Sequence, residues 1–428
     1  MLRVFQCVLI AIAFYSGGEV AWGADFTPIT GWDEQLYPSF LVSTASVKEA
    51  PWIDSESPEI LGDRGGMLGV SITSPGDETP IKVTVTCNDI MEPTTFSGTL
   101  PEDGVTYLVF PKIKYRYSKL AEFIQATPVA ITFRVQVGDE EAKDVTEETS
   151  TVTVRPINDC PFIVLMGEQK VDISMSFAAY VNEQHPFLDK VLRECLDRGY
   201  VESFSGYQGG EAEVIRQVYA LWDTLVARDV RYSSITATSV AGQTVASQHV
   251  RLLEESLNNF QANCVDGSVL MASLLRKIGI EPFLVMVPGH CYMGFYLDAK
   301  KTTLVAMETT LLGSTVAEGD EYAEVEVLEN SVDEDNRDPT TWASFSNAIS
   351  VGSNNFEEAK QKFDEPDNNE YMLIDISQAR KQGVLPIAFR GKSEFLGVQP
   401  VEPDDSDPSN TDDGEEGSDK SKDTNEEN

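Results

Sequence analysis

Five segments between residues 66 and 157 alternate apolar and polar side chains and are rich in β-branched residues. Turn-forming pieces such as SPGDETP and LPEDG separate them. This alternation is typical of strands that bury one face, and their spacing predicts a small antiparallel, Ig-like β-sandwich over residues 24–160. The segments are GVSITS, IKVTVTC, VTYLVF, VAITFRVQV and STVTVRPI.

The segment PINDCP, residues 156–161, has the composition of a turn and marks the predicted end of the sandwich. Beyond it the apolar period changes to that of helices, in PFLDKVLRECLDRG and GEAEVIRQVYALWDTLVARDV. Shorter helices are expected at TWASFSNAI and FEEAKQKF, and strands at FLVMV, HCYMGFYLD, LVAMETT and EYMLIDI. We therefore predict a second, α+β domain over residues 161–398, with helices first and an antiparallel sheet after them.

The two ends of the chain differ in composition from the middle. Arg3 and the short apolar run VLIAIAF predict a cleaved export signal over residues 1–23, and thus an exported protein in the periplasm, in the cell envelope or outside the cell. No other stretch is apolar enough to predict membrane insertion. The last segment, 399–428, is acidic, almost free of apolar residues and predicted to be disordered. The net charge of −38 argues against nucleic acid or anionic lipid as a partner.

Five cysteines follow the predicted signal: Cys87, Cys160, Cys195, Cys264 and Cys291. An odd number in an exported protein leaves at least one thiol unpaired within the chain. A bridge between Cys87 and Cys160 is one option, and Cys195 is expected in a core or a bridge. Cys264 is the candidate for the unpaired thiol.

Cys264 opens a predicted helix that runs to Ile278 and ends at Gly279. A thiol nucleophile must be deprotonated, and a helix N-terminus or a neighbouring imidazolium favours the thiolate. His290 begins the second strand after this helix, and Glu308 lies on the strand after that. A hairpin turn near residue 300 brings His290 and Glu308 close together, so the acid is placed to orient the imidazole.

Three segments together resemble the transglutaminase-like superfamily, whose fold is of the papain type. They are NCVDGSVLMASLLRKIGIEP, VPGHCYMGFYLD and VAMETT, preceded by the helix in VIRQVYALWDTLVARDVRYS. The resemblance covers residues 210–312. It implies that Cys264 is the nucleophile, His290 the base and Glu308 the orienting acid. It also implies oxyanion donors at the Cys264 backbone N–H and the Gln248 side chain.

The function implied by the resemblance is acyl transfer from a protein or peptide amide through a thioester on Cys264. Such chemistry requires no metal and no cofactor. The alternative from another class is an inactive transglutaminase-like scaffold that acts as an envelope or extracellular binding protein, since a fold does not fix a function.

Simpler interpretations of the same residues stay open. In one interpretation Cys264 is a buried structural cysteine, and in another it forms a disulfide with Cys291. A zinc site of Cys264, His290, Cys291 and Glu308 is disfavoured, because His290 and Cys291 point to opposite faces of their strand. Asp266 is expected to be a partner of the helix N-terminus, and His185 and His249 are expected at the surface.

Overall fold

The computed structural model describes residues 25–48, 57–138, 145–167, 169–234, 239–315, 328, 331–365, 368 and 370–397. The described residues up to Leu396 form one compact unit. The chain is α+β, as expected, with several separate sheets. Both the predicted export signal and the predicted disordered tail lie outside the described residues.

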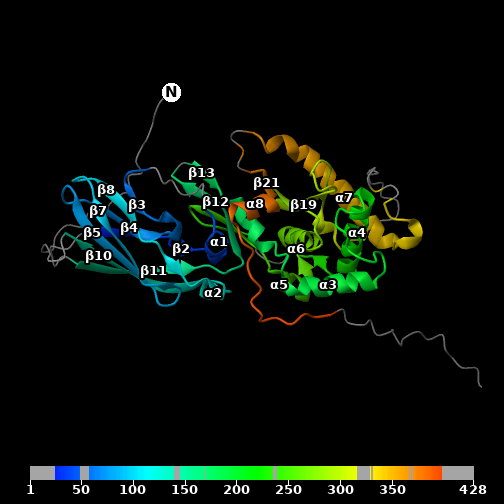
Figure 1. Ribbon diagram of the computed structural model, residues 1–428, viewed down its shortest axis with the longest axis horizontal. Coiled ribbons are helices and arrows are strands. Elements are labelled where there is room, and N and C mark those ends of the chain that lie inside the picture. The colour runs from blue at the N-terminus through cyan, green and yellow to red at the C-terminus, as the bar shows by residue number, and fades with distance from the viewer. Residues whose placement is uncertain are drawn as a thin grey trace, which may run out of the picture. The chain divides into compact units, whose positions relative to one another are not determined.

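The N-terminal part is a sandwich of two sheets whose inner faces share one core (Figure 1). One sheet has the order β1-β4-β8-β3 and the other β2-β11-β10-β5-β7. The bounds are β1 Phe26–Thr30, β2 Gln35–Leu36, β3 Ile60–Gly62, β4 Leu68–Thr73, β5 Thr79–Thr86, β7 Thr94–Leu100, β8 Thr106–Phe110, β10 Thr127–Val137 and β11 Val145–Val154.

All five predicted strand segments form strands of this sandwich, as β4, β5, β8, β10 and β11. Along β10 every second residue from Val129 to Val137 is buried, while Thr132 faces outward and contacts Thr149 of β11 at 2.9 Å. The expectation of a purely antiparallel sandwich is wrong, because β3 pairs with β8 and β2 pairs with β11 in parallel. Strands β2 and β3 are short and far in sequence from their partners. No short hairpin connects them to those partners, so the sequence does not predict whether the pairing is parallel or antiparallel.

A third sheet joins the two halves of the compact unit. Its order is β13-β12-β16-β15, with bounds β12 Asp159–Met166, β13 Gln169–Asp172, β15 Ser239–Ala241 and β16 Val245–His249. The predicted boundary at residue 160 falls inside β12. Val164 and Val245 of this sheet belong to the sandwich core, whereas Cys160 belongs to the second core. The Ser39 hydroxyl from the sandwich donates to the Asp159 carbonyl.

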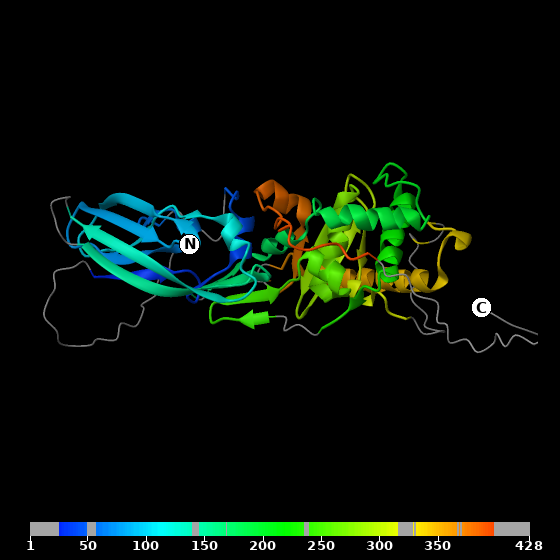
Figure 2. The ribbon, with the colours of Figure 1, turned by 90° about the horizontal axis from the view of Figure 1, so that it is seen from below.

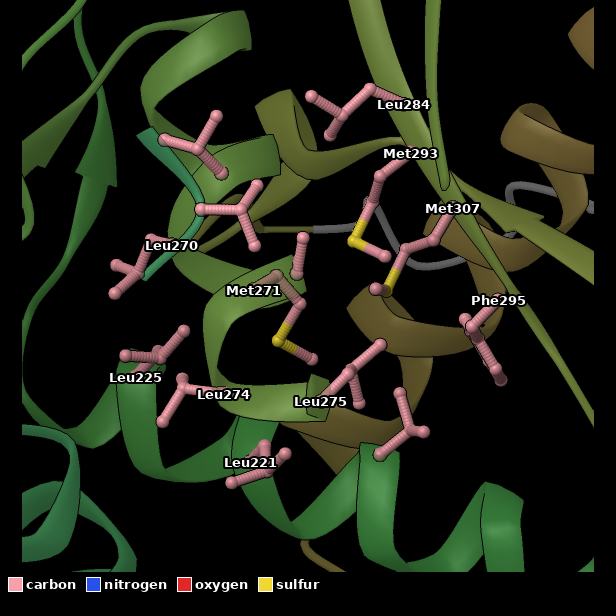
Figure 3. Close-up of a cluster of buried hydrophobic side chains, with 14 of the residues drawn as sticks. Leu221, Leu225, Leu270, Met271, Leu274, Leu275, Leu284, Met293, Phe295 and Met307 are labelled. Carbon is pink, nitrogen blue, oxygen red and sulfur yellow. The ribbon is translucent and has the colours of Figure 1, made fainter. Parts of the chain in front are cut away.

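The second core is built on a four-stranded antiparallel sheet of order β20-β19-β18-β21. Its strands are β18 Pro282–Val287, β19 His290–Tyr296, β20 Leu304–Met307 and β21 Met372–Asp375. Helix α6, Cys264–Lys277, packs on one face of this sheet. On that face it meets the strand residues Leu284, Met293 and Phe295. Figure 3 shows Met271, Leu274 and Leu275 of α6 between these strand side chains and Leu221 and Leu225 of α4, Glu211–Ala227.

The opposite face of this sheet packs against α7, Pro339–Ala359, and a smaller cluster lies there around Phe283, Tyr292 and Phe356 (Figures 1 and 2). The two helices expected at TWASFSNAI and FEEAKQKF are one helix, because no proline or capping break separates them. The expected order of helices before sheet is also incomplete, since α7 and α8 follow β20 and β21 joins the sheet last. The remaining helices are α1 Pro38–Ser43, α2 Tyr117–Leu120, α3 Pro186–Asp197, α5 Leu253–Asn259 and α8 Ile376–Gln382.

Candidate active site

The start of α6 is fixed by a closed set of hydrogen bonds. The Asn263 side chain accepts from the Asp266 N–H at 2.8 Å, and the Asp266 carboxylate accepts from the Asn263 N–H at 3.0 Å. Asp266 is fully buried and also accepts from the Arg251 guanidinium at 2.6 Å. This capping box confirms Asp266 as a structural partner of the helix start and fixes the main chain at Cys264, the residue after Asn263.

Cys264 is the first residue of the helix and is half-buried. Its backbone N–H has no intrahelical partner, as at every helix N-terminus, and no acceptor in the described residues takes it. The Thr309 hydroxyl donates to the Cys264 carbonyl at 3.4 Å and contacts the Ser268 hydroxyl at 3.1 Å. Cys264 is therefore partly exposed, and its carbonyl is tied to Thr309.

His290 and Glu308 form a close pair, with 2.6 Å between Nε2 of the ring and Oε2 of the carboxylate. The other carboxylate oxygen accepts from the Thr310 N–H at 3.1 Å and from its hydroxyl at 2.7 Å. Glu308 is buried, whereas the His290 side chain is 30% exposed. The buried carboxylate thus holds Nε2 and leaves Nδ1 for a second partner.

The register of β19 and β20 explains how these two residues meet. Met293 pairs with Met307, so by extension Tyr292 lies opposite Glu308 and His290 lies diagonally beyond it. Glu308 leaves the strand as the cap of a short 3₁₀ helix, Thr309–Leu311, and its N–H donates to the Ala348 carbonyl of α7 at 2.9 Å. The pair is diagonal rather than directly opposed, and the length of a glutamate side chain spans the offset.

The Cys264 thiol and the Glu308 carboxylate both act on the His290 ring. Together they raise the pKa of His290 to about 10, against an opposing effect of burial. Both neighbours favour the protonated ring. The structure brings Cys264, His290 and Glu308 together, as the sequence predicts.

Gln248, the predicted side-chain donor, lies elsewhere. It is on β16 opposite Cys160, and its amide donates to the His249 carbonyl at 3.1 Å. No hydrogen bond in the described part of the chain links it to Cys264. Its strand is tied to the third sheet, so spacing along the sequence does not carry it to the start of α6.

His185 is not a surface residue, contrary to the sequence-based expectation. It is buried, caps α3 by accepting from the Phe187 N–H at 3.1 Å, and lies 3.0 Å from Glu254. The proline after it, at the first position of α3, is the signal that indicates a helix cap here. His249 is partly exposed and lies 3.4 Å from Asp159.

All five cysteines after residue 24 are free, so neither the suggested Cys87–Cys160 bridge nor the Cys264–Cys291 bridge is present. Cys195 lies in the second core, as expected, and burial raises its pKa to about 11. Cys291 is also buried, and its pKa is raised well above the ordinary value by burial first and then by the nearby Cys264. In the described residues no three His, Cys, Asp or Glu side chains are grouped to hold a metal ion.

The sequence interpretation missed the two threonines that follow the acid. Thr310 saturates the free oxygen of Glu308, and Thr309 ties the turn to the start of α6. The signal was available in the quoted strand LVAMETT, whose last two residues are hydroxylic. Such residues commonly bond to a side chain or main chain close by.

Comparisons of this chain with protein-family models, with curated proteins and with solved structures return no match. Within the described residues, no helix combines the length and the apolar character needed to cross a membrane.

Proposed function

We propose that this chain is an exported, transglutaminase-like enzyme that transfers acyl groups from protein or peptide amides through a thioester on Cys264. One observation carries the proposal: a partly exposed cysteine at a helix start interacts with a histidine whose Nε2 is held by a buried carboxylate. The order of cysteine helix, histidine strand and following acid supports the family assignment. Export rests on the composition of residues 1–23 alone.

In the first half of the reaction, the Cys264 thiolate adds to the amide carbonyl carbon and the carbonyl oxygen becomes an oxyanion. The free N–H of Cys264 is one donor to that oxyanion. The C–N bond then breaks, and His290 gives its proton to the departing amine. The product of this half is a thioester on Cys264 and a neutral amine.

In the second half, an amine or a water molecule attacks the thioester carbonyl. His290, now neutral, takes the proton of the attacking group, and the thiolate leaves as the C–S bond breaks. The thiolate–imidazolium pair is thereby restored. Glu308 takes no part in the proton transfers and acts by orienting the ring.

The experiment is alkylation of the whole chain with iodoacetamide between pH 5 and pH 10, with the label located by mass spectrometry. Among the five cysteines after residue 24, Cys264 alone should be labelled, because the other four are buried. It should react well below pH ~8.5, where an ordinary thiol is half ionised. His290→Ala should slow labelling at pH 6 by tenfold or more, because a neutral thiol then replaces the ion pair.

His249→Ala is the matched control, since this histidine is also partly exposed and paired with an acid, Asp159. It should leave the rate unchanged. Two results would contradict the enzyme proposal and favour an inactive binding scaffold. In one, Cys264 is labelled only at the pH of an ordinary thiol. In the other, the His290→Ala variant reacts as fast as the wild type. Assays with a glutamine-containing peptide as acyl donor, with and without an added amine, then distinguish transfer to the amine from hydrolysis by water.

A further inference from the structure

Tyr232 lies beside the candidate site although no sequence argument pointed to it. It belongs to the two-residue strand β14, Arg231–Tyr232, which pairs in parallel with β17, Gln261–Ala262. Tyr232 is opposite Ala262, and the Ser233 N–H donates to the Ala262 carbonyl at 2.9 Å. Ala262 is two residues before Cys264, so this pairing holds the tyrosine next to the start of α6.

The other side of β14 meets the segment that follows the acid. Strand β14 contacts the 3₁₀ helix Thr309–Leu311, which begins directly after Glu308. A Cβ added at Gly313 would lie 3.1 Å from the Val230 carbonyl, so the two segments approach each other at main-chain distance. Tyr232 is therefore held between the segment that carries Cys264 and the segment that carries Glu308.

The side chain of Tyr232 is 46% exposed, so a bound molecule at Cys264 has access to it. Partial burial, and then the negative charges of Cys264 and Glu308, raise the pKa of Tyr232. The phenol therefore keeps its proton at neutral pH and is a hydrogen-bond donor.

We propose that Tyr232 donates the second hydrogen bond to the oxyanion, beside the backbone N–H of Cys264. This inference rests on the proposed acyl transfer and names a catalytic residue for it. An acyl-transfer site needs donors aimed at the oxygen that becomes charged, and Gln248 is held in another sheet. Tyr232 is a partly exposed residue whose strand contacts both the segment before Cys264 and the segment after Glu308.

The test compares two reagents that attack the same thiol by different routes. p-Nitrophenyl acetate acylates the thiolate through an oxyanion, forms a C–S bond and releases p-nitrophenolate. Iodoacetamide alkylates it by displacement of iodide at a saturated carbon, with no oxyanion. Tyr232→Phe should therefore lower the acylation rate of Cys264 by roughly 10²-fold, the loss typical of one oxyanion donor, and leave the alkylation rate within twofold of wild type.

Tyr117→Phe is the matched control, because Tyr117 in α2 of the sandwich is similarly exposed, at 43%. It should change neither rate. A Tyr232→Phe variant that keeps the wild-type acylation rate would overturn the proposal, and so would one that loses both rates equally, since that pattern means a disturbed thiol. If wild-type Cys264 is alkylated and acylated no faster than an ordinary thiol, the proposed function itself fails, which is a distinct result.

Discussion

At the scale of single residues, the site depends on the charge of one ring. His290 bonds to a buried carboxylate and also interacts with the Cys264 thiol, and both neighbours favour the protonated ring. The three candidate residues were identifiable from sequence because each begins or ends an element with a clear pattern. The prediction for Gln248 failed because its position depends on a distant pairing. Its strand pairs with Asp159 and Cys160, almost ninety positions earlier in the chain.

We predict that His290 stays protonated to about pH 9 and titrates near pH 10, which NMR of the imidazole resonances will measure. With only three histidines in the chain, His290→Ala gives the assignment directly. Cys264→Ala should lower this pKa most and Glu308→Gln next, because the bond to the thiol is the larger cause. A titration near pH 6.5 in the wild type would contradict the ion pair.

The same shift predicts how stability depends on pH. Because the folded-state pKa of His290 lies above its unfolded value of ~6.5, its contribution is fully present below pH ~6.5 and is lost as the pH rises through about 10. The Tm difference between wild type and His290→Ala should therefore shrink over that range. A difference that grows with pH would contradict this sign.

At the scale of elements, α7 sets the position of the acid. The Glu308 N–H donates to the Ala348 carbonyl, and Gly352, one turn further along α7, lies against the backbone of Met307. A Cβ at Gly352 would be 2.6 Å from the Met307 N and Cα atoms. The sequence predicted helix in this region but divided it in two, since apolar period alone does not show which helix packs at main-chain distance on a strand.

We predict that Gly352→Ala destabilises the chain by about 1–3 kcal/mol, the usual cost of overpacking, even though alanine favours a helix more than glycine does. Because the added methyl meets backbone rather than a flexible side chain, β20 must shift and carry Glu308 with it. Thermal or urea unfolding will measure the stability, and alkylation of Cys264 at pH 6 will report the site.

Asn354→Ala is the matched control on the same helix, at an exposed position. It should be neutral or slightly stabilising in the same measurements. If Gly352→Ala and Asn354→Ala are equally stable, α7 can move away from β20 without a cost in the free energy of unfolding. That result would contradict the claim that α7 positions Glu308.

At the scale of the whole molecule, the two cores of the compact unit share a sheet. Strands β12 and β16 supply Val164 and Val245 to the sandwich core and Cys160 to the second core. The Thr244 N–H and hydroxyl also donate to the Asp33 carboxylate, at 2.8 Å each. Loss of either core exposes the shared sheet, so we expect the two to unfold together.

Native thiols report on both cores and allow a direct test. Cys87 is buried in the sandwich core and Cys195 in the second core. Short pulses of iodoacetamide along a thermal ramp, read by mass spectrometry, should label both at the same temperature, while Cys264 is already labelled in the cold. Midpoints more than about 5 °C apart would show that the two cores unfold independently.

The sequence by itself determined five strands of the sandwich, the α+β character of the rest and the three residues that meet at the site. Those features follow from local period, from helix start and stop signals, and from the short hairpin between β19 and β20. Only the tertiary structure decided the parallel pairs, the shared sheet, the burial of His185 and the place of Tyr232. Each of these depends on pairing between segments far apart in the chain, and local side-chain patterns carry no record of such a partner.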